Sequence, residues 1–144
     1  MSTDPKQLFP HARDAHAALS GLVLLAGHWD LSHQIAQDIS SREGSYWHAI
    51  AHRIEPDSSN SGYWFRRVGE HPIFATLYEQ ASALLAAAKV DWRPKTRWDP
   101  HRFLTFCDEA RTEPATAKYD CAQQIQTAEC ELLFSWCALK TMGL

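Results

Sequence analysis

Apolar residues recur every three or four positions along most of this chain, and no long segment alternates with the two-residue period of a strand. The first run of this pattern predicts a helix over about residues 14–40. Residues 41–44 are predicted as a turn, followed by a short helix with Ser45 as its N-cap. That helix should end near Glu55, because the residue before Pro56 is pushed out of helical geometry.

Four more helices are predicted after Pro56, and the first of them is short and ended by Gly69. Pro72 suits the first turn of the next helix, and the Asp99–Pro100 pair suits the start of the one after it. The expected bounds are about residues 63–68, 72–90, 100–111 and 115–141. The pattern therefore predicts a single all-α domain that spans the whole chain, built as a bundle of five or six helices.

Helical geometry, at about 100° per residue, sorts the polar side chains by face. His28 falls inside the apolar arc of the first predicted helix and is expected to be buried, while His33 lies at the edge of that arc. An ordinary hydrogen-bonded core histidine is the alternative interpretation of His28. Glu129 falls inside the apolar arc of the last predicted helix, so it should either pair with an arginine such as Arg53 or Arg66 or act as a catalytic group.

The helix before Pro56 carries the most specific candidate chemistry. His48, His52 and Glu55 are spaced i, i+4 and i+7 beside the apolar stripe. Two histidines at this spacing can share a metal ion, and Glu55 is placed to act as a further ligand or a general base. Zinc, iron, nickel and manganese are the candidate divalent metals. Because H-x-x-x-H is common by chance, a pair of hydrogen-bonded surface histidines remains the alternative.

Further polar residues near this helix are candidates for ligand binding. Arginine side chains can hold a carboxylate or phosphate through paired hydrogen bonds. The candidate ligand-binding residues are Arg53, Asp57, Asn60, Arg66, Arg67 and His71. Arg66 and Arg67 are adjacent and point about 100° apart, so at most one of them should lie centrally in a pocket. Asn60 also suits a cap or a turn.

Composition narrows the class of protein. The net charge is −3, from 14 basic and 17 acidic residues, which argues against broad binding to nucleic acid. The apolar run over residues 22–26 is too short to span a bilayer, and the N-terminal segment has no cleavable signal pattern. The four cysteines include no C-x-x-C pair. A protein of the reducing cytoplasm, without a membrane or nucleic-acid partner, is expected.

The stretch over residues 44–74 contains the pattern W-H-x-x-x-H-R-x-E-x-D-x-x-N, followed by Y-W-F-R-R-V-G and H-P. An upstream S-H-x-I-x-Q-x-I element begins at Ser32. Together these elements resemble the signature of a family of small bacterial and fungal proteins to which we attach no established activity. The resemblance covers about the first half of the chain. It implies no reaction, but it directs attention to His33.

Three hypotheses for function follow from these residues. In the first, a small metal-dependent enzyme has His48 and His52 as ligands, joined by His28 or His33, with Glu55 or Glu129 as ligand or base. In the second, a non-enzymatic helical module uses its arginine and histidine pocket to hold a small anion or a partner's carboxylate. In the third, the polar cluster only cross-links helices of an interaction protein. The sequence favours the first hypothesis, with a small molecule as the substrate and the arginines placed to suit an anionic one, and it leaves homo-oligomerisation open.

Overall fold

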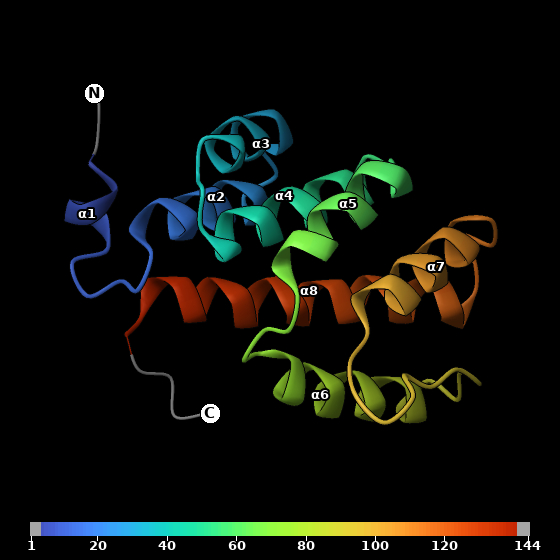
Figure 1. The fold of residues 1–144 in the computed structure, drawn as a ribbon. Coiled ribbons are helices and arrows are strands. Elements are labelled where there is room, and N and C mark those ends of the chain that lie inside the picture. Colours follow the sequence, from blue (N-terminus) through green and yellow to red (C-terminus); the bar gives the residue numbers. More distant parts are fainter. Residues whose placement is uncertain (1–3, 141–144) are drawn as a thin grey trace.

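The computed structural model describes residues 4–140, and this part of the chain forms eight helices and no strand (Figure 1). The helices are α1 (Pro5–Leu8), α2 (Ala15–Leu25), α3 (Trp29–Gln37), α4 (Arg42–Ile54), α5 (Ser58–Val68), α6 (Phe74–Ala87), α7 (Pro100–Arg111) and α8 (Ala117–Ala138). The all-α class is confirmed. The expected count of five or six helices is too low, because one expected helix is divided in two and α1 was not predicted.

The helix expected over residues 14–40 is broken between Leu25 and Trp29. Gly27 has a φ of 91°, a conformation that glycine adopts without the strain a side chain would bring. The chain reverses there, so that α3 packs against α2. Ser20 and Ser32 join the two helices, since each hydroxyl donates a hydrogen bond to the other residue's backbone carbonyl, at 3.0 and 2.8 Å. Apolar periodicity continues across the break, which is why the pattern alone did not locate it.

Helix α4 begins at Arg42, so the prediction of a turn over residues 41–44 is wrong. The N-cap is Ser41, whose hydroxyl oxygen accepts a hydrogen bond from the backbone N–H of Gly44. The same hydroxyl donates a hydrogen bond of 2.6 Å to the carboxylate of Asp14, the N-cap of α2. One serine therefore starts α4 and fixes its first turn to the start of α2.

The remaining bounds differ from expectation by a few residues, apart from α7, which matches. Helix α5 begins five residues earlier than the expected segment, because Asp57 caps it, and it ends at Gly69 as predicted. Helix α6 begins after Pro72, at Phe74. Helix α8 ends at Ala138, and the expected end at Thr141 lies outside the described residues.

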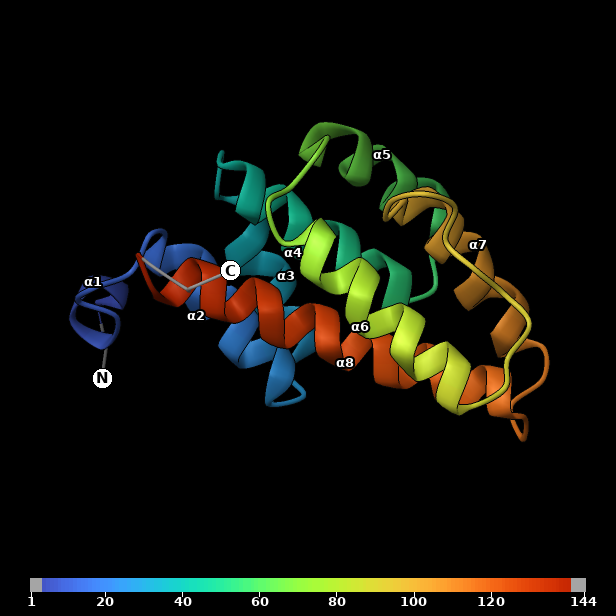
Figure 2. The ribbon, with the colours of Figure 1, turned by 90° about the horizontal axis from the view of Figure 1, so that it is seen from below.

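Helix α8 is the long central element, with α6 alongside it and α2 on the opposite side (Figures 1 and 2). Helix α4 contacts α2, α3 and α5, and all of its residues from Glu43 to Arg53 are buried. The indole of Trp47 packs so closely on α2 that a Cβ added to Gly21 would lie 2.3 Å from it. Polar side chains of α4 are therefore held inside the fold rather than on its surface.

None of the helices between residues 4 and 140 combines the length and the apolar character needed to cross a lipid bilayer. The four cysteines are buried and unpaired with one another. Burial raises the pKa of Cys107 to about 11 and that of Cys130 to about 12, so both thiols are protonated near neutral pH.

Candidate metal centre

Three imidazoles converge where α3 packs on α4. His48 and His52 lie one turn apart on α4, and His33 reaches them from α3. Each offers one ring nitrogen, and these three nitrogens lie within 4.8 Å of one another. The Nε2 atoms of His33 and His52 are 3.3 Å apart. The fold thus brings together His48 and His52, which were predicted from their i, i+4 spacing, and His33, which the sequence placed only at the edge of an apolar arc.

One of the nitrogen separations is that of a tetrahedral metal ion. With metal–nitrogen bonds of about 2.0–2.1 Å, two ligands of a tetrahedral zinc ion lie about 3.3 Å apart. The Nε2 atoms of His33 and His52 are at this separation. The third imidazole, that of His48, lies 4.5 Å from His33 and 4.8 Å from His52 between ring centroids. The site therefore needs only small side-chain adjustments to bind an ion.

Two tryptophans fix the orientation of the imidazoles. Trp29 stacks on His33 with a centroid separation of 5.0 Å and an interplanar angle of 9°. Its indole Nε1 donates a 2.7 Å hydrogen bond to the backbone carbonyl of Ala51, which anchors α3 to α4. From α5, Trp64 stacks on His48 at 4.0 Å and 14°. The rings are thus held by packing before any ligand binds.

Glu55 contacts the far side of the His52 ring. Its carboxylate oxygen lies 2.8 Å from Nδ1 of His52, whereas Nε2 of the same ring faces His33. A carboxylate in this position fixes the tautomer with hydrogen on Nδ1 and leaves the Nε2 lone pair for a metal ion. Glu55 is exposed, so this hydrogen bond lies at the outer edge of the group.

The electrostatic environment keeps two of the imidazoles neutral. Burial, together with smaller contributions from His33 and His52, lowers the pKa of His48 to about 4. Burial and His52 also lower the pKa of His33. Neutral imidazoles are the form that binds metal ions, so at neutral pH protons compete weakly for these nitrogens. Within the described residues, Nδ1 of His48 is buried without a hydrogen-bond partner.

His28 does not join this group. It is exposed and occupies the N-cap position of α3, beside the break at Gly27. The prediction that His28 is buried is therefore wrong. It assumed one continuous helix, but α2 ends at Leu25, so His28 does not lie on the apolar face of that helix. Solvent reaches the three imidazoles from the side of His33, which is only partly buried.

Glu129 is fully buried, as predicted, but it belongs to a different group. It forms an ion pair with Arg53 and accepts a 2.7 Å hydrogen bond from the hydroxyl of Tyr46. Burial lowers the pKa of Arg53 but the adjacent carboxylate raises it by more, so the guanidinium stays charged. Both arginine and glutamate are thus engaged with each other, and neither is among the residues that surround the imidazoles.

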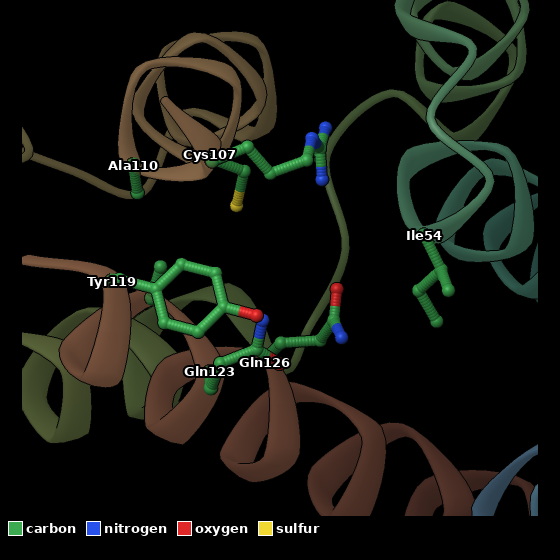
Figure 3. A pocket seen from close by; sticks show the side chains of 8 residues that line it. Ile54, Cys107, Ala110, Tyr119, Gln123 and Gln126 are labelled. Atoms are coloured by element: carbon green, nitrogen blue, oxygen red, sulfur yellow. The ribbon is translucent and has the colours of Figure 1, made fainter. Parts of the chain in front are cut away.

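A small cavity of about 160 Å³ lies next to this pair, between the end of α4, α7 and α8 (Figure 3). Gln126 lines it and accepts a 3.2 Å hydrogen bond from Nε of Arg53. Cys107 also lines it, but its protonated thiol is a poor nucleophile. The cavity therefore offers hydrogen-bonding groups but no activated one.

The other predicted ligand-binding residues are dispersed. Asp57 caps α5, and its two carboxylate oxygens accept hydrogen bonds from the backbone and side-chain nitrogens of Asn60. Asp57 also lies within 4.8 Å of ligand atoms of His52 and Glu55, at the exposed edge of the site. Arg67 is exposed, with its guanidinium 5.3 Å from the centre of the Trp64 ring. Of these residues, Asp57 lies near the imidazole of His52, and Arg67 is connected to the imidazoles through Trp64.

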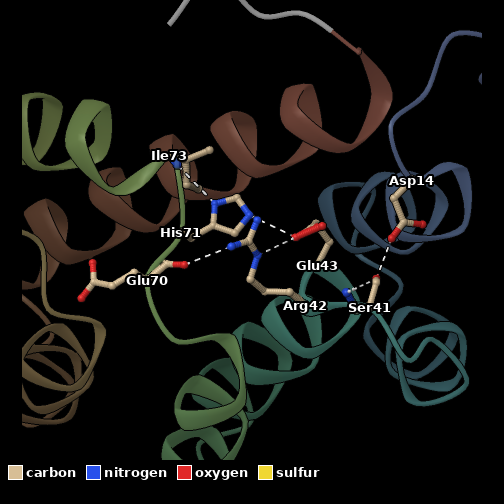
Figure 4. A network of polar contacts seen from close by, with 8 residues as sticks. Asp14, Ser41, Arg42, Glu43, Glu70, His71 and Ile73 are labelled. Carbon is tan, nitrogen blue, oxygen red and sulfur yellow. Dashed lines mark hydrogen bonds and ion pairs between the residues drawn. The ribbon is translucent and has the colours of Figure 1, made fainter.

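Arg66 and His71 lie elsewhere, around the connection between α5 and α6. Arg66 is exposed and lines a separate cavity. His71 is buried, and Figure 4 shows it between the backbone N–H of Ile73 and the carboxylate of Glu43. Burial lowers the pKa of His71, although its hydrogen bond to Glu43 opposes this. Both ring nitrogens are occupied, so His71 has no free one to offer a ligand.

Sequence reasoning missed the two tryptophans that hold the imidazoles. Trp29 precedes His33 by four residues, and Trp64 follows the N-cap of its own helix by seven. The i, i+4 spacing of Trp29 and His33 was a usable signal, because residues four apart on a helix lie one above the other. The pairing of Trp64 with His48 joins two helices and had no such signal.

Comparison with known proteins leaves the site to be interpreted from its own geometry. No family model matches the chain, and no curated protein or solved structure matches it significantly.

Proposed function

We propose that this protein binds a zinc ion through His33, His48 and His52 and is a metal-dependent enzyme that acts on a small anionic substrate. The observation that carries this proposal is the convergence of three imidazole nitrogens within 4.8 Å, with one pair at 3.3 Å. Three protein ligands leave the fourth position of a tetrahedral zinc ion for water or substrate, which distinguishes catalytic from structural zinc sites. Zinc held in this way supplies an activated water or a Lewis acid for a carbonyl or phosphoryl oxygen.

The ligand set favours zinc over the other candidate metals. Imidazole nitrogen suits zinc, iron and nickel, whereas manganese prefers oxygen ligands. The nitrogen separation is that of tetrahedral geometry, which zinc adopts most readily among these ions. The burial of His48 and His52 excludes most solvent from the inner side of the site and leaves His33 as the side of approach.

The residues around the imidazoles support an anionic substrate. Arg67 is exposed and lies against Trp64, so its guanidinium is available to a negatively charged group near His48. Arg53 cannot take this role, because it is buried with Glu129. In this proposal Glu55 positions His52 and Arg67 orients the substrate, while Glu129 supports the fold.

The test is zinc stoichiometry in protein that has been stripped with chelator, reconstituted with zinc and dialysed. We expect about one zinc per chain, retained in the wild type and lost from His33→Ala, His48→Ala and His52→Ala. His28→Ala is the matched control, since it removes an exposed histidine from the same region without touching the site. Circular dichroism should show the same helix content in all variants.

Replacement of zinc by cobalt(II) gives a second readout. A tetrahedral cobalt site absorbs strongly in the visible range, and an octahedral one absorbs weakly, so the spectrum reports the geometry directly. Failure of the folded wild-type protein to retain zinc or cobalt would overturn the proposal. It would then favour the second hypothesis, in which the same region binds an anion without a metal ion.

A further inference from the structure

A second candidate site lies away from the imidazoles, around the connection between α5 and α6 and the start of α7. Two adjoining cavities of about 330 and 470 Å³ share a wall formed by Glu70, Phe74, Arg97 and Trp98. Each is within the range of small-molecule sites, which runs from about 300 to 1,000 Å³. We propose that this double cavity binds an organic anion, with its charged group in the smaller cavity and its apolar body in the larger one.

Trp98 provides the first argument. Its side chain is 2% exposed, and its indole Nε1 has no hydrogen-bond partner among residues 4–140. An indole nitrogen can only donate, and a buried donor without an acceptor is unfavourable. Trp98 lines both cavities, so a ligand bound at their junction would contact its ring, and a small rotation of the side chain would let a ligand oxygen accept the Nε1–H hydrogen bond.

The basic residues of the smaller cavity provide the second argument. Arg66 comes from α5, Arg97 from the loop before α7, and His101 from the first turn of α7. Two acidic residues also line this cavity. Asp99 is engaged as the N-cap of α7 and accepts a 2.9 Å hydrogen bond from the backbone N–H of His101, and Glu70 pairs with Arg97. Among residues 4–140 Arg66 forms no ion pair, so its guanidinium is the cation that is left for a ligand.

The ion pair between Glu70 and Arg97 lies on the wall shared by the two cavities. Its nitrogen–oxygen distance is 3.6 Å, and the two side chains are 71% and 77% exposed. Exposed pairs of this kind are weak, so a ligand carboxylate or phosphate can replace Glu70 as the partner of Arg97. The pair thus holds the guanidinium beside the junction without blocking it.

The larger cavity suits an apolar body rather than a second anion. Pro72, Phe74, Tyr78 and Trp98 line it, together with Glu79, whose carboxylate disfavours negative charge there. His71 also borders it, but both ring nitrogens are occupied by Glu43 and Ile73. The ligand is therefore an amphipathic anion, such as an aromatic carboxylate or phosphate monoester.

Phenyl phosphate is the first probe, with inorganic phosphate and benzyl alcohol as controls that lack the apolar body or the charge. Binding is measured by NMR on ¹⁵N-labelled protein, in which the indole N–H of Trp98 is assigned by its loss in Trp98→Phe. We expect phenyl phosphate to shift this signal at millimolar concentrations and both controls to bind at least about fivefold more weakly. The indole signal of Trp29 should not move. Benzoate distinguishes a carboxylate from a phosphate group.

Arg66→Ala and Arg93→Ala form the matched pair, because both residues are exposed arginines and, of the two, Arg66 lines the cavity. Arg66→Ala should weaken phenyl phosphate binding at least about fivefold, and Arg93→Ala should leave it unchanged. An unmoved Trp98 signal, or equal weakening by both variants, would overturn the proposal. Binding of inorganic phosphate as tight as that of phenyl phosphate would overturn the apolar part of it. Zinc stoichiometry is independent of each result.

Discussion

Helix α4 carries two groups of polar side chains on different faces, and the two groups are balanced in opposite ways. On one face, Arg53 and Tyr46 meet Glu129 of α8 in a buried group whose charges cancel. On another, His48 and His52 meet His33 of α3, and the carboxylate of Glu55 contacts the outer side of the His52 ring. The first group balances its own charges, whereas the second brings three ring nitrogens together.

This difference distinguishes polar residues that stabilise the fold from polar residues that are available to bind a ligand. The buried carboxylate and guanidinium pair with each other. Nη1 of Arg53 has no hydrogen-bond partner among residues 4–140, and the guanidinium carbon lies 4.7 Å from the centre of the Phe103 ring. The three imidazoles instead bring donor atoms of one kind together. Since two of them have lowered pKa values, they present lone pairs rather than charges, an arrangement that a cation completes.

The largest expected effect comes from breaking the balanced group. Glu129→Ala leaves a buried guanidinium without its counter-ion, and it should lower the free energy of unfolding by about 3–5 kcal/mol in urea denaturation. The double variant Arg53→Met/Glu129→Leu removes both charges and should be far closer to the wild type. If Glu129→Ala cost less than about 1 kcal/mol, the pair would not be the structural element described.

The next effect is the pH dependence of the metal-free protein. The pKa of His48 is about 4 in the folded protein and 6.5 in the unfolded chain. Between these pH values the unfolded chain therefore binds a proton that the folded chain does not. The free energy of unfolding should therefore fall on acidification through this window, by about 2–3 kcal/mol.

The measurement is urea denaturation in chelator at pH values above, within and below that window. His48→Phe keeps a ring to stack on Trp64 and should remove most of the loss. His33 and His71 also have lowered pKa values in the folded protein, so the free energy of unfolding of His48→Phe should still fall on acidification, but less steeply. A stability that rose on acidification would contradict the burial of a neutral His48.

A smaller effect is expected from the carboxylate behind His52. Glu55→Gln keeps the shape of the side chain but removes the charge that holds Nδ1–H, and it should weaken zinc binding by about 10–100-fold. Competition with a chromophoric chelator measures this affinity. Unfolding of the metal-free variant should be close to that of the wild type, since the Glu55 side chain is exposed. Complete loss of zinc would instead make Glu55 a ligand.

The sequence predicted the helical class and the part of the site that lies on one helix. His48 and His52 could be selected because a fixed period places residues four apart on the same face. His33 was placed correctly at the edge of an apolar arc, but its approach to His52 depends on how α3 packs on α4. That packing follows from the reversal at Gly27, which apolar periodicity does not record.

The error at His28 has the same cause. His28 was assigned to the buried face of a continuous helix, and the reversal exposes it. Glu129 was recognised as buried because its helix is regular from Ala117 to Ala138, and its pairing with Arg53 was one of the stated alternatives. The junction lined by Trp98 draws on three separate segments, so no local pattern in the chain could have indicated it.

The smallest expected effect tests whether Asp57 stabilises the fold, as the Arg53–Glu129 pair does, or belongs to the metal site with the three imidazoles. Its carboxylate caps α5 through Asn60 but also lies near His52 and Glu55. If the cap is its role, Asp57→Ala should lower the melting temperature of the metal-free protein by about 2–5 °C and leave zinc affinity unchanged, while Asp57→Ser, which can still cap, should restore stability. Calorimetry and chelator competition give the two readings. Weaker zinc binding in both variants would instead show that Asp57 contributes to the metal site, because serine can replace the N-cap of α5 but not the negative charge of the carboxylate.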